Sequence, residues 1–84
     1  MWRIGTLHMQ GLLASYHDGE HVKGITLERN AYSSRVEYLI FPEDFETWTK
    51  PKGKKIPSET RDEMIQKLYD AAQERGVTIH LSPA

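Results

Sequence analysis

The sequence predicts a small α+β fold in which one helix packs on a single face of a mostly antiparallel sheet. Two kinds of periodicity and one turn signal predict it. Apolar residues alternate with polar ones in the first half of the chain, and an Asp-Gly pair divides two of these segments. The second half carries one apolar stripe of helical spacing. A chain of 84 residues has room for one domain, residues 1–84, with a modest core.

A hairpin is predicted near the start. Leu12 to His17 and Glu20 to Leu27 flank Asp18-Gly19, a pair that suits a two-residue turn because both central positions take positive φ. The tip is therefore predicted at Asp18-Gly19. Gly24 interrupts the second arm, as a bulge or as a point where another backbone approaches closely.

Two further segments read as strands in the first half. Arg35 to Ile40 alternates, and Pro42 closes this strand because proline cannot donate to a ladder. Trp2 to Leu7 is a candidate for an additional strand at the start. One face of the sheet then has no covering helix, so it is either solvated or a binding surface.

A helix and a last strand follow in the second half. Ser58 is predicted to cap the helix, and Thr60 with Glu63 forms a rival capping box. Arg75-Gly76 ends it, and Val77 to Leu81 alternates as a strand. The predicted order is β-β-β-α-β, with the optional first strand before it. The stripe of the helix consists of Met64, Ile65, Leu68, Ala71 and Ala72.

The charge and the amino-acid composition limit the classes of function that the chain can have. The chain has 11 Lys and Arg against 12 Asp and Glu, so no overall positive field attracts nucleic acid or an anionic membrane. No segment is long and apolar enough to span a bilayer, so no membrane association is expected. There is no cysteine, which excludes disulfides and thiolate chemistry and favours the cytoplasm as the location.

The residues around the hairpin tip look at first like a metal cluster. His17, Asp18, Glu20 and His21 are close in sequence, but His-x-x-x-His binds zinc when both histidines lie on one helical face. Here they straddle a turn and project to opposite faces of the ribbon, so a solvated turn is the better interpretation. No serine or histidine stands in a nucleophile motif. We expect no enzyme activity, no cofactor and no metal.

The connection from Pro42 to Pro57 holds the candidate binding residues. Lysines follow a tryptophan there, a pattern that can hold single-stranded nucleic acid through phosphate contacts and base stacking. A nearby acidic run would weaken that field, and a charged loop tip is the plainer alternative. The candidate partner-binding residues are Glu43, Asp44, Glu46, Trp48, Lys50, Lys52, Lys54 and Lys55.

Trp48 has two interpretations. A tryptophan in a long strand-to-helix connection most often folds back and closes one end of the core. If it stays exposed, it is a candidate binding anchor, because tryptophan is enriched among interface hot spots. The core position is favoured.

The second half resembles a known family. The segment Tyr38-Leu39-Ile40-Phe41-Pro42-Glu43 leads to Trp48-x-x-Pro51, to Ile56-Pro57-Ser58-Glu59 at the helix start, and to Gly76-Val77-Thr78-Ile79. This pattern is similar to immunity protein family seventy-four, found beside bacterial polymorphic toxins, and it covers Tyr38 to Leu81. The resemblance implies a non-enzymatic protein that binds and neutralises a toxin, and it marks Trp48 as important. The leading hypothesis is thus a protein-binding module, and the alternative is a nucleic-acid-binding domain that uses the lysines and Trp48.

Overall fold

The computed structural model describes residues 1–6, 11–32 and 34–82 of the protein. Its sheet has five strands in the order β1-β2-β3-β4-β5; β1 to β4 run antiparallel, and β5 is parallel to β4. The predicted α+β class is confirmed, including the additional first strand. The elements are β1 (Trp2–Thr6), β2 (Gly11–Asp18), β3 (His21–Arg29), β4 (Glu37–Ile40), the short 3-10 helix η1 (Pro42–Phe45), α1 (Ser58–Glu74) and β5 (Thr78–Leu81).

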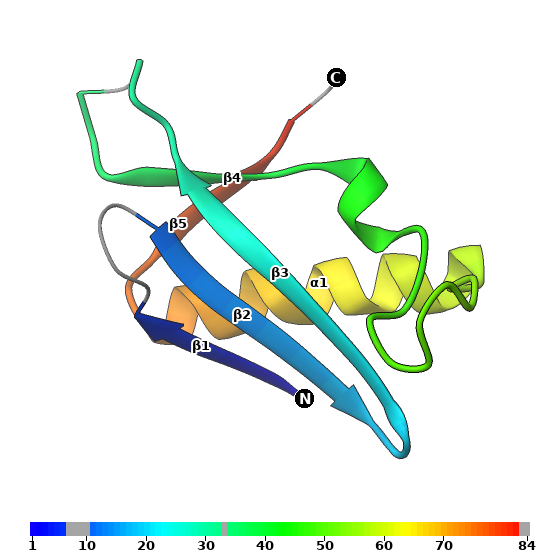
Figure 1. The fold of residues 1–84 in the computed structure, drawn as a ribbon. Helices are drawn as coiled ribbons and strands as arrows, with labels where there is room; N and C mark the ends of the chain where they lie inside the picture. The colour runs from blue at the N-terminus through cyan, green and yellow to red at the C-terminus, as the bar shows by residue number, and fades with distance from the viewer. Residues whose placement is uncertain (7–10, 33, 83–84) are drawn as a thin grey trace.

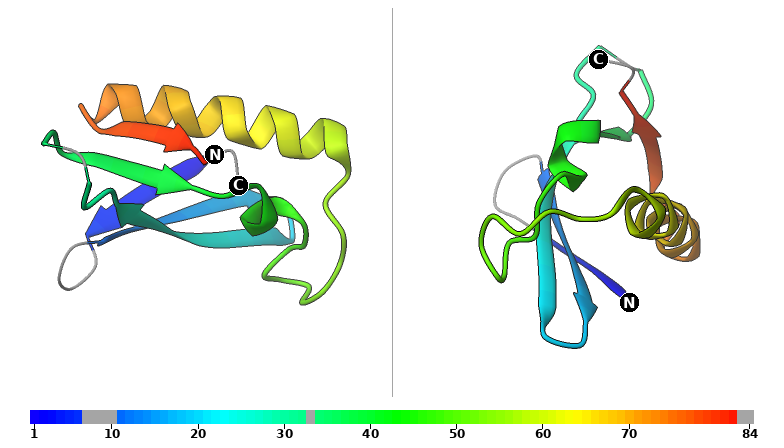
Figure 2. Two further views of the ribbon diagram at one scale, coloured as in Figure 1. Left: turned by 90° about the horizontal axis from the view of Figure 1, so that it is seen from above. Right: turned by 90° about the vertical axis from the view of Figure 1, so that its right-hand side faces the viewer.

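The helix α1 covers one face of the sheet (Figures 1 and 2). Its apolar stripe meets the inward residues of the strands, because strand side chains alternate between faces and only one set can reach the helix. Four aromatic rings of this core come from β1, β2, η1 and the connection that follows η1. The buried core consists of Trp2, Ile4, Ala14, Tyr16, Ile25, Leu27, Ile40, Phe45, Trp48, Ile56, Met64, Leu68, Ala72 and Ile79.

The hairpin forms, but its tip lies one residue later than predicted. Asp18 pairs with His21, so Gly19 and Glu20 are the central residues of the turn, and the prediction of Asp18-Gly19 was wrong. Gly19 takes the first central position with φ of 59°, a conformation that glycine adopts without a steric penalty. His17 now pairs with Val22, and the two histidines still lie on opposite faces of the ribbon.

The helix begins without the predicted cap. Pro57 is the N-cap residue, no side chain caps the helix, and Ser58 already lies in the first turn, so the Ser58 cap was wrong. Its C-terminus agrees with the prediction. Gly76 has φ of 70°, and its N–H donates to the carbonyl of Gln73 while the N–H of Val77 donates to Ala72, which closes the helix as a Schellman motif.

The strands differ from the prediction by one or two residues at their ends: β2 is Gly11–Asp18, β3 is His21–Arg29 and β5 begins at Thr78. β4 begins at Glu37 rather than at Arg35, and Val36 is 58% exposed just before it. β1 ends at Thr6, and Leu7, the last residue of the predicted strand, lies outside the described residues. β3 contains no bulge at Gly24, which pairs regularly with Ser15.

Side chains at the end of α1 and within it contact both free edges of the sheet. In an antiparallel pair, alternate residues turn their polar backbone groups away from the neighbour. Met1 and His17 exchange both of their hydrogen bonds, so the groups of Ile4 point outward, and the Ile4 carbonyl accepts a hydrogen bond from Arg75. At the other edge, the N–H of Leu81 donates to the Tyr69 hydroxyl at 3.0 Å. The helix thus supplies a partner to each edge strand.

Candidate functional site

The connection between η1 and α1 is held against β3 by backbone hydrogen bonds. β4 pairs with β3 only at Glu28 and Arg29, so the first half of β3 has β2 on one side and no described strand on the other. The connection takes that place: the N–H of Val22 donates to the Lys50 carbonyl at 2.8 Å, and the Val22 carbonyl accepts from Thr49 at 2.9 Å. These bonds make the connection part of the sheet rather than a free loop.

A side-chain bond extends this attachment by one residue pair. The N–H of Gly24 donates to the Thr49 hydroxyl at 2.9 Å. The group beside Gly24 is a side chain and not a backbone, so neither interpretation of Gly24, a bulge or a close backbone approach, agrees with the structure.

Replacing Thr49 by valine is expected to lower the free energy of unfolding by about 0.5–1 kcal/mol, because the Gly24 N–H loses its partner at a solvent-exposed place. Valine keeps the shape of threonine, and the variant Thr49→Ser keeps the hydroxyl and serves as the control. Urea unfolding of the three proteins measures the effect. Equal destabilisation by serine and valine would show that the methyl group, not the hydroxyl, stabilises the attachment.

The segment from Lys50 to Lys55, here called the basic turn, is closed at its base. The N–H of Trp48 donates to the Lys54 carbonyl at 2.7 Å, and the N–H of Ile56 donates to Glu46 at 2.9 Å. Gly53 has φ of 82°, which lets the chain reverse between these bonds. The turn therefore projects from a hydrogen-bonded base.

Trp48 is a core residue. Its side chain is 5% exposed, and its ring stacks on Tyr16 at a centroid distance of 6.4 Å and an interplanar angle of 26°. On its other side it contacts the His21 ring at 4.8 Å. The interpretation as an exposed anchor is thus corrected: the ring contributes apolar area to the core and holds the basic turn from beneath.

The four lysines of the basic turn are exposed and make no ion pair with any described residue. The Nζ of Lys54 lies 3.2 Å from Nε2 of His21, on the hairpin. Because an ammonium group can only donate, this contact requires an unprotonated Nε2. The structure brings Lys50, Lys54 and Lys55 beside the hairpin tip, and Lys52 lies between them in the basic turn.

The acidic residues divide between different surroundings. Glu43 and Glu46 are exposed, whereas Asp44 is partly buried. Burial raises the pKa of Asp44, a hydrogen bond with the backbone of Phe41 opposes that rise, and the positive charge of Lys23 opposes it more weakly. Burial also lowers the pKa of Lys23. Asp44 and Lys23 border a separate depression over β3, so Asp44 does not lie with the lysines of the basic turn.

Asp44→Asn is expected to raise the midpoint of thermal unfolding near neutral pH. The raised pKa means that the folded state binds the proton more tightly than the unfolded state. Ionised Asp44 therefore lowers stability above its folded pKa, and this cost disappears as the pH falls through that value. Thermal scans of both proteins at neutral and acidic pH should show a gain only at neutral pH.

Glu46→Gln removes the same charge from an exposed residue of the connection whose charge is not among those that shift the pKa of Asp44, and it controls for a general charge effect. Lower stability of Asp44→Asn at neutral pH would show that the attraction between Asp44 and Lys23 outweighs the burial of the carboxylate.

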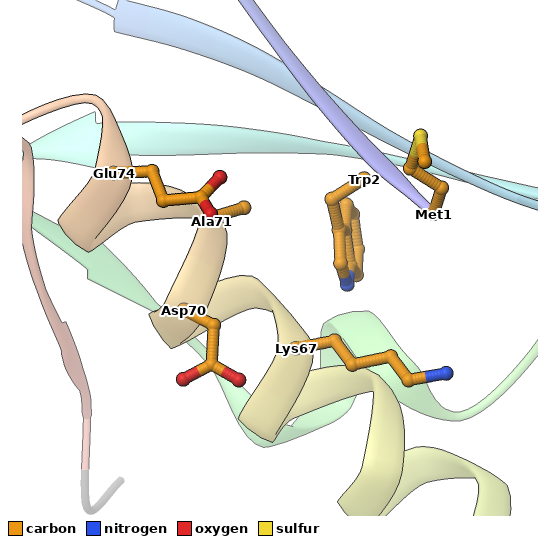
Figure 3. A pocket seen from close by; sticks show the side chains of 6 residues that line it. All are labelled: Met1, Trp2, Lys67, Asp70, Ala71 and Glu74. Atoms are coloured by element: carbon orange, nitrogen blue, oxygen red, sulfur yellow. The ribbon is translucent and has the colours of Figure 1, made fainter.

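Three further surface depressions lie near the basic turn, the hairpin tip and β1. The first, of about 250 Å³, lies at the basic turn and is lined by Asp18, His21, Trp48, Lys54, Lys55, Pro57 and Thr60. The second, of about 470 Å³, lies at the hairpin tip and is lined by Gly19, Glu20, Val22, Lys50 and Pro51. The third, of about 440 Å³, separates β1 from α1 and is lined by Met1, Trp2, Lys67, Asp70, Ala71 and Glu74 (Figure 3).

The depression beside β1 is electrostatically mixed. Lys67 forms an ion pair with Glu63 at 2.8 Å, one turn earlier on α1, and Asp70 accepts a hydrogen bond from Gln66. The ion pair lowers the pKa of Glu63 and raises the pKa of Lys67. Its lysine is therefore already neutralised, in contrast to those of the basic turn.

The described part of the chain holds neither a metal cluster nor a membrane-spanning helix. No group of three His, Asp or Glu side chains in residues 1–6, 11–32 and 34–82 is arranged to hold a metal ion. In the same residues, α1 is too short and too polar to cross a membrane.

No family model, curated protein or solved structure matches the chain. The site is therefore described from its own geometry. Sequence reasoning found the lysines, because they are adjacent in the chain, but it missed their pairing with the hairpin. His21 and Lys54 are 33 residues apart, and no local pattern indicates that they meet.

Proposed function

We propose that this chain is a small, non-enzymatic protein-binding module that acts in the bacterial cytoplasm as an immunity-type inhibitor of a toxin, and that it binds through the connection from Glu43 to Lys55. The observation that carries the proposal is the basic turn, whose four exposed lysines form no ion pair with a described residue and whose base is bonded to β3 and supported by buried Trp48. A surface fixed before binding loses less conformational entropy on association, which favours recognition. The resemblance of Tyr38 to Leu81 to immunity protein family seventy-four adds the toxin as the kind of partner.

The charges of this region suit a partner whose own surface is mixed. Exposed lysines lie beside exposed Glu43 and Glu46, and complementary charges set the orientation and rate of encounter more than the final affinity. Trp48 contributes by supporting the basic turn from within the core. Because its ring is buried, a partner could contact it only if the core opened.

The experiment is affinity capture of the tagged protein from its native host's lysate, with and without nuclease. We expect one stoichiometric protein, retained after nuclease treatment, that inhibits growth when produced alone and no longer does so when produced with this chain. A protein partner without such toxicity would support the binding module and refute the inhibitor. The double variant Lys54→Glu/Lys55→Glu should slow association with that partner, about tenfold in the rate constant at low salt. An unchanged association rate constant would show that the basic turn does not take part in binding the partner.

Nucleic-acid binding is the second candidate, and the four exposed lysines, which form no ion pair with a described residue, are the observation that favours it. It predicts affinity that falls steeply with salt, because each phosphate contact releases counterions. Recovered nucleic acid, or a captured protein that is lost on nuclease treatment, would put this candidate first. Burial of Trp48 speaks against it, because the expected stacking ring is covered.

A further inference from the structure

Two segments that are distant in sequence form one continuous surface. The tip of the β2–β3 hairpin lies beside the basic turn (Figures 1 and 2), and the pairing of Val22 with Lys50 and the contact of His21 with Lys54 join them. We call this surface the tip surface. It consists of Asp18, Gly19, Glu20, His21, Val22, Lys50, Pro51, Lys54, Lys55 and Thr60.

Positive charge dominates the tip surface. It holds three lysines, Lys50, Lys54 and Lys55, against two carboxylates, and all five side chains are exposed. None of these lysines forms an ion pair with a described residue. An acidic surface complements this arrangement, and the carboxylates of Asp18 and Glu20 limit the orientations in which it can approach.

The depression of about 250 Å³ gives the surface one specific contact point. Lys54 and Lys55 border it, the Thr60 side chain borders it as well, and Trp48 and Pro57 form apolar walls. Ammonium and hydroxyl groups beside an apolar wall suit a carboxylate, which accepts charge-assisted hydrogen bonds. Asp18 also lines the depression, so two ammonium groups face one carboxylate and a second carboxylate is needed to balance them.

We propose that the tip surface docks on an acidic surface of a protein partner, and that one carboxylate of the partner enters the depression between Lys54 and Lys55. This inference rests on the proposed function and specifies the partner's chemistry. It has a consequence for the mode of inhibition. If the toxin cuts nucleic acid, its phosphate-binding cleft is basic, so the tip surface binds elsewhere on the toxin and leaves that cleft to other contacts.

An acidic protein fits the tip surface better than a nucleic acid does. Single strands are held by stacking on exposed rings, and the tryptophan of this region is 5% exposed. Asp18 and Glu20 repel a phosphate chain that follows the lysines, whereas a protein can place a cation opposite them.

The test uses ¹⁵N-labelled full-length protein and two probes of equal length, an oligoglutamate peptide and an oligothymidylate. Amide shifts are followed during titration at low salt. We expect the peptide to shift residues 18–22, 48–56 and 58–60 and to leave β1, β5 and the end of α1 unchanged. Lys54→Glu should weaken peptide binding about tenfold. Arg29→Glu makes the same charge change on an exposed residue outside the tip surface and should alter the affinity for the peptide by less than about twofold. Lys54→Arg keeps the positive charge and should bind the peptide about as tightly as the wild-type protein does.

Several outcomes would overturn the inference. They are the absence of shifts at the tip surface, equal weakening by Lys54→Glu and Arg29→Glu, and tighter binding of oligothymidylate than of oligoglutamate. Slower diffusion of the protein alone, with shifts at the same residues, would show that a second copy covers the surface. The spectrum of each variant also reports whether it is folded.

Binding experiments with the captured partner distinguish a failure of the docking inference from a failure of the proposed function. If Lys54→Glu still retains that partner with wild-type kinetics, the docking inference fails and the protein-binding function stands. If wild-type protein captures no partner but oligoglutamate maps to the tip surface, the recognition of acidic groups stands and the inhibitor function fails.

Discussion

Trp2→Ala is expected to destabilise the protein by about 3–5 kcal/mol, which is comparable to the whole stability of many small domains. Trp2 is 6% exposed, its ring contacts Tyr16 and Phe45 at centroid distances of 5.2 and 6.2 Å, and its Nε1 donates to the Met64 carbonyl at 2.7 Å. One side chain thus connects β1, β2, η1 and α1. We expect the midpoint of thermal unfolding to fall by about 15–30 °C.

The indole also forms a wall of the open depression between β1 and α1 (Figure 3), so water can enter the space that alanine leaves. This places the loss toward the lower end of the range. Trp2→Phe is the matched control, because it keeps most of the apolar area and loses only the N–H, at a cost of about 1–2 kcal/mol. Similar losses for alanine and phenylalanine would show that the hydrogen bond to Met64, rather than packing, connects β1 to the helix.

Trp48→Ala is expected to cost about 3–5 kcal/mol as well, because the ring lies between Tyr16 and His21 and is almost completely buried. The loss has a local signature that Trp2→Ala lacks. Amide exchange of Val22 should become faster, since its partner Lys50 follows the missing ring and loses its support. Chemical denaturation and hydrogen exchange measure the two effects.

Trp48→Phe keeps an aromatic ring on Tyr16 and should lose less than half as much stability. If Trp48 were instead a binding anchor, alanine would leave the unfolding curve unchanged and lower only the affinity for a partner. That result would contradict the core position.

Elements determined by adjacent residues could be predicted from the sequence. The helix of α1 and its end at Gly76 follow from periodicity and from one glycine, and the hairpin follows from Gly19. The shift of the tip by one residue could not be predicted, because both turns are locally acceptable and the difference depends on pairing along the whole of β2 and β3.

The candidate site was only half predictable for a related reason. The lysines and the choice between two positions of Trp48 could be stated from the chain alone. The attachment of Thr49 and Lys50 to Val22 could not, because the edge of β3 is vacant only once β4 has paired at Glu28 and Arg29. The Ser58 cap failed because the helix begins directly after Pro57, which already supplies the extended residue before the first turn.

The contacts of Arg75 with Ile4 and of Tyr69 with Leu81 have a consequence for how this chain behaves among other sheet proteins. A strand from a neighbouring molecule would have to displace a side chain of α1 before it could bond to either place, so growth of the sheet by accretion is discouraged at both ends. We therefore expect each edge to accept a further strand less readily than an edge whose backbone groups are all free. Recognition at these edges is then left to side chains, where charge and shape decide which molecule is bound.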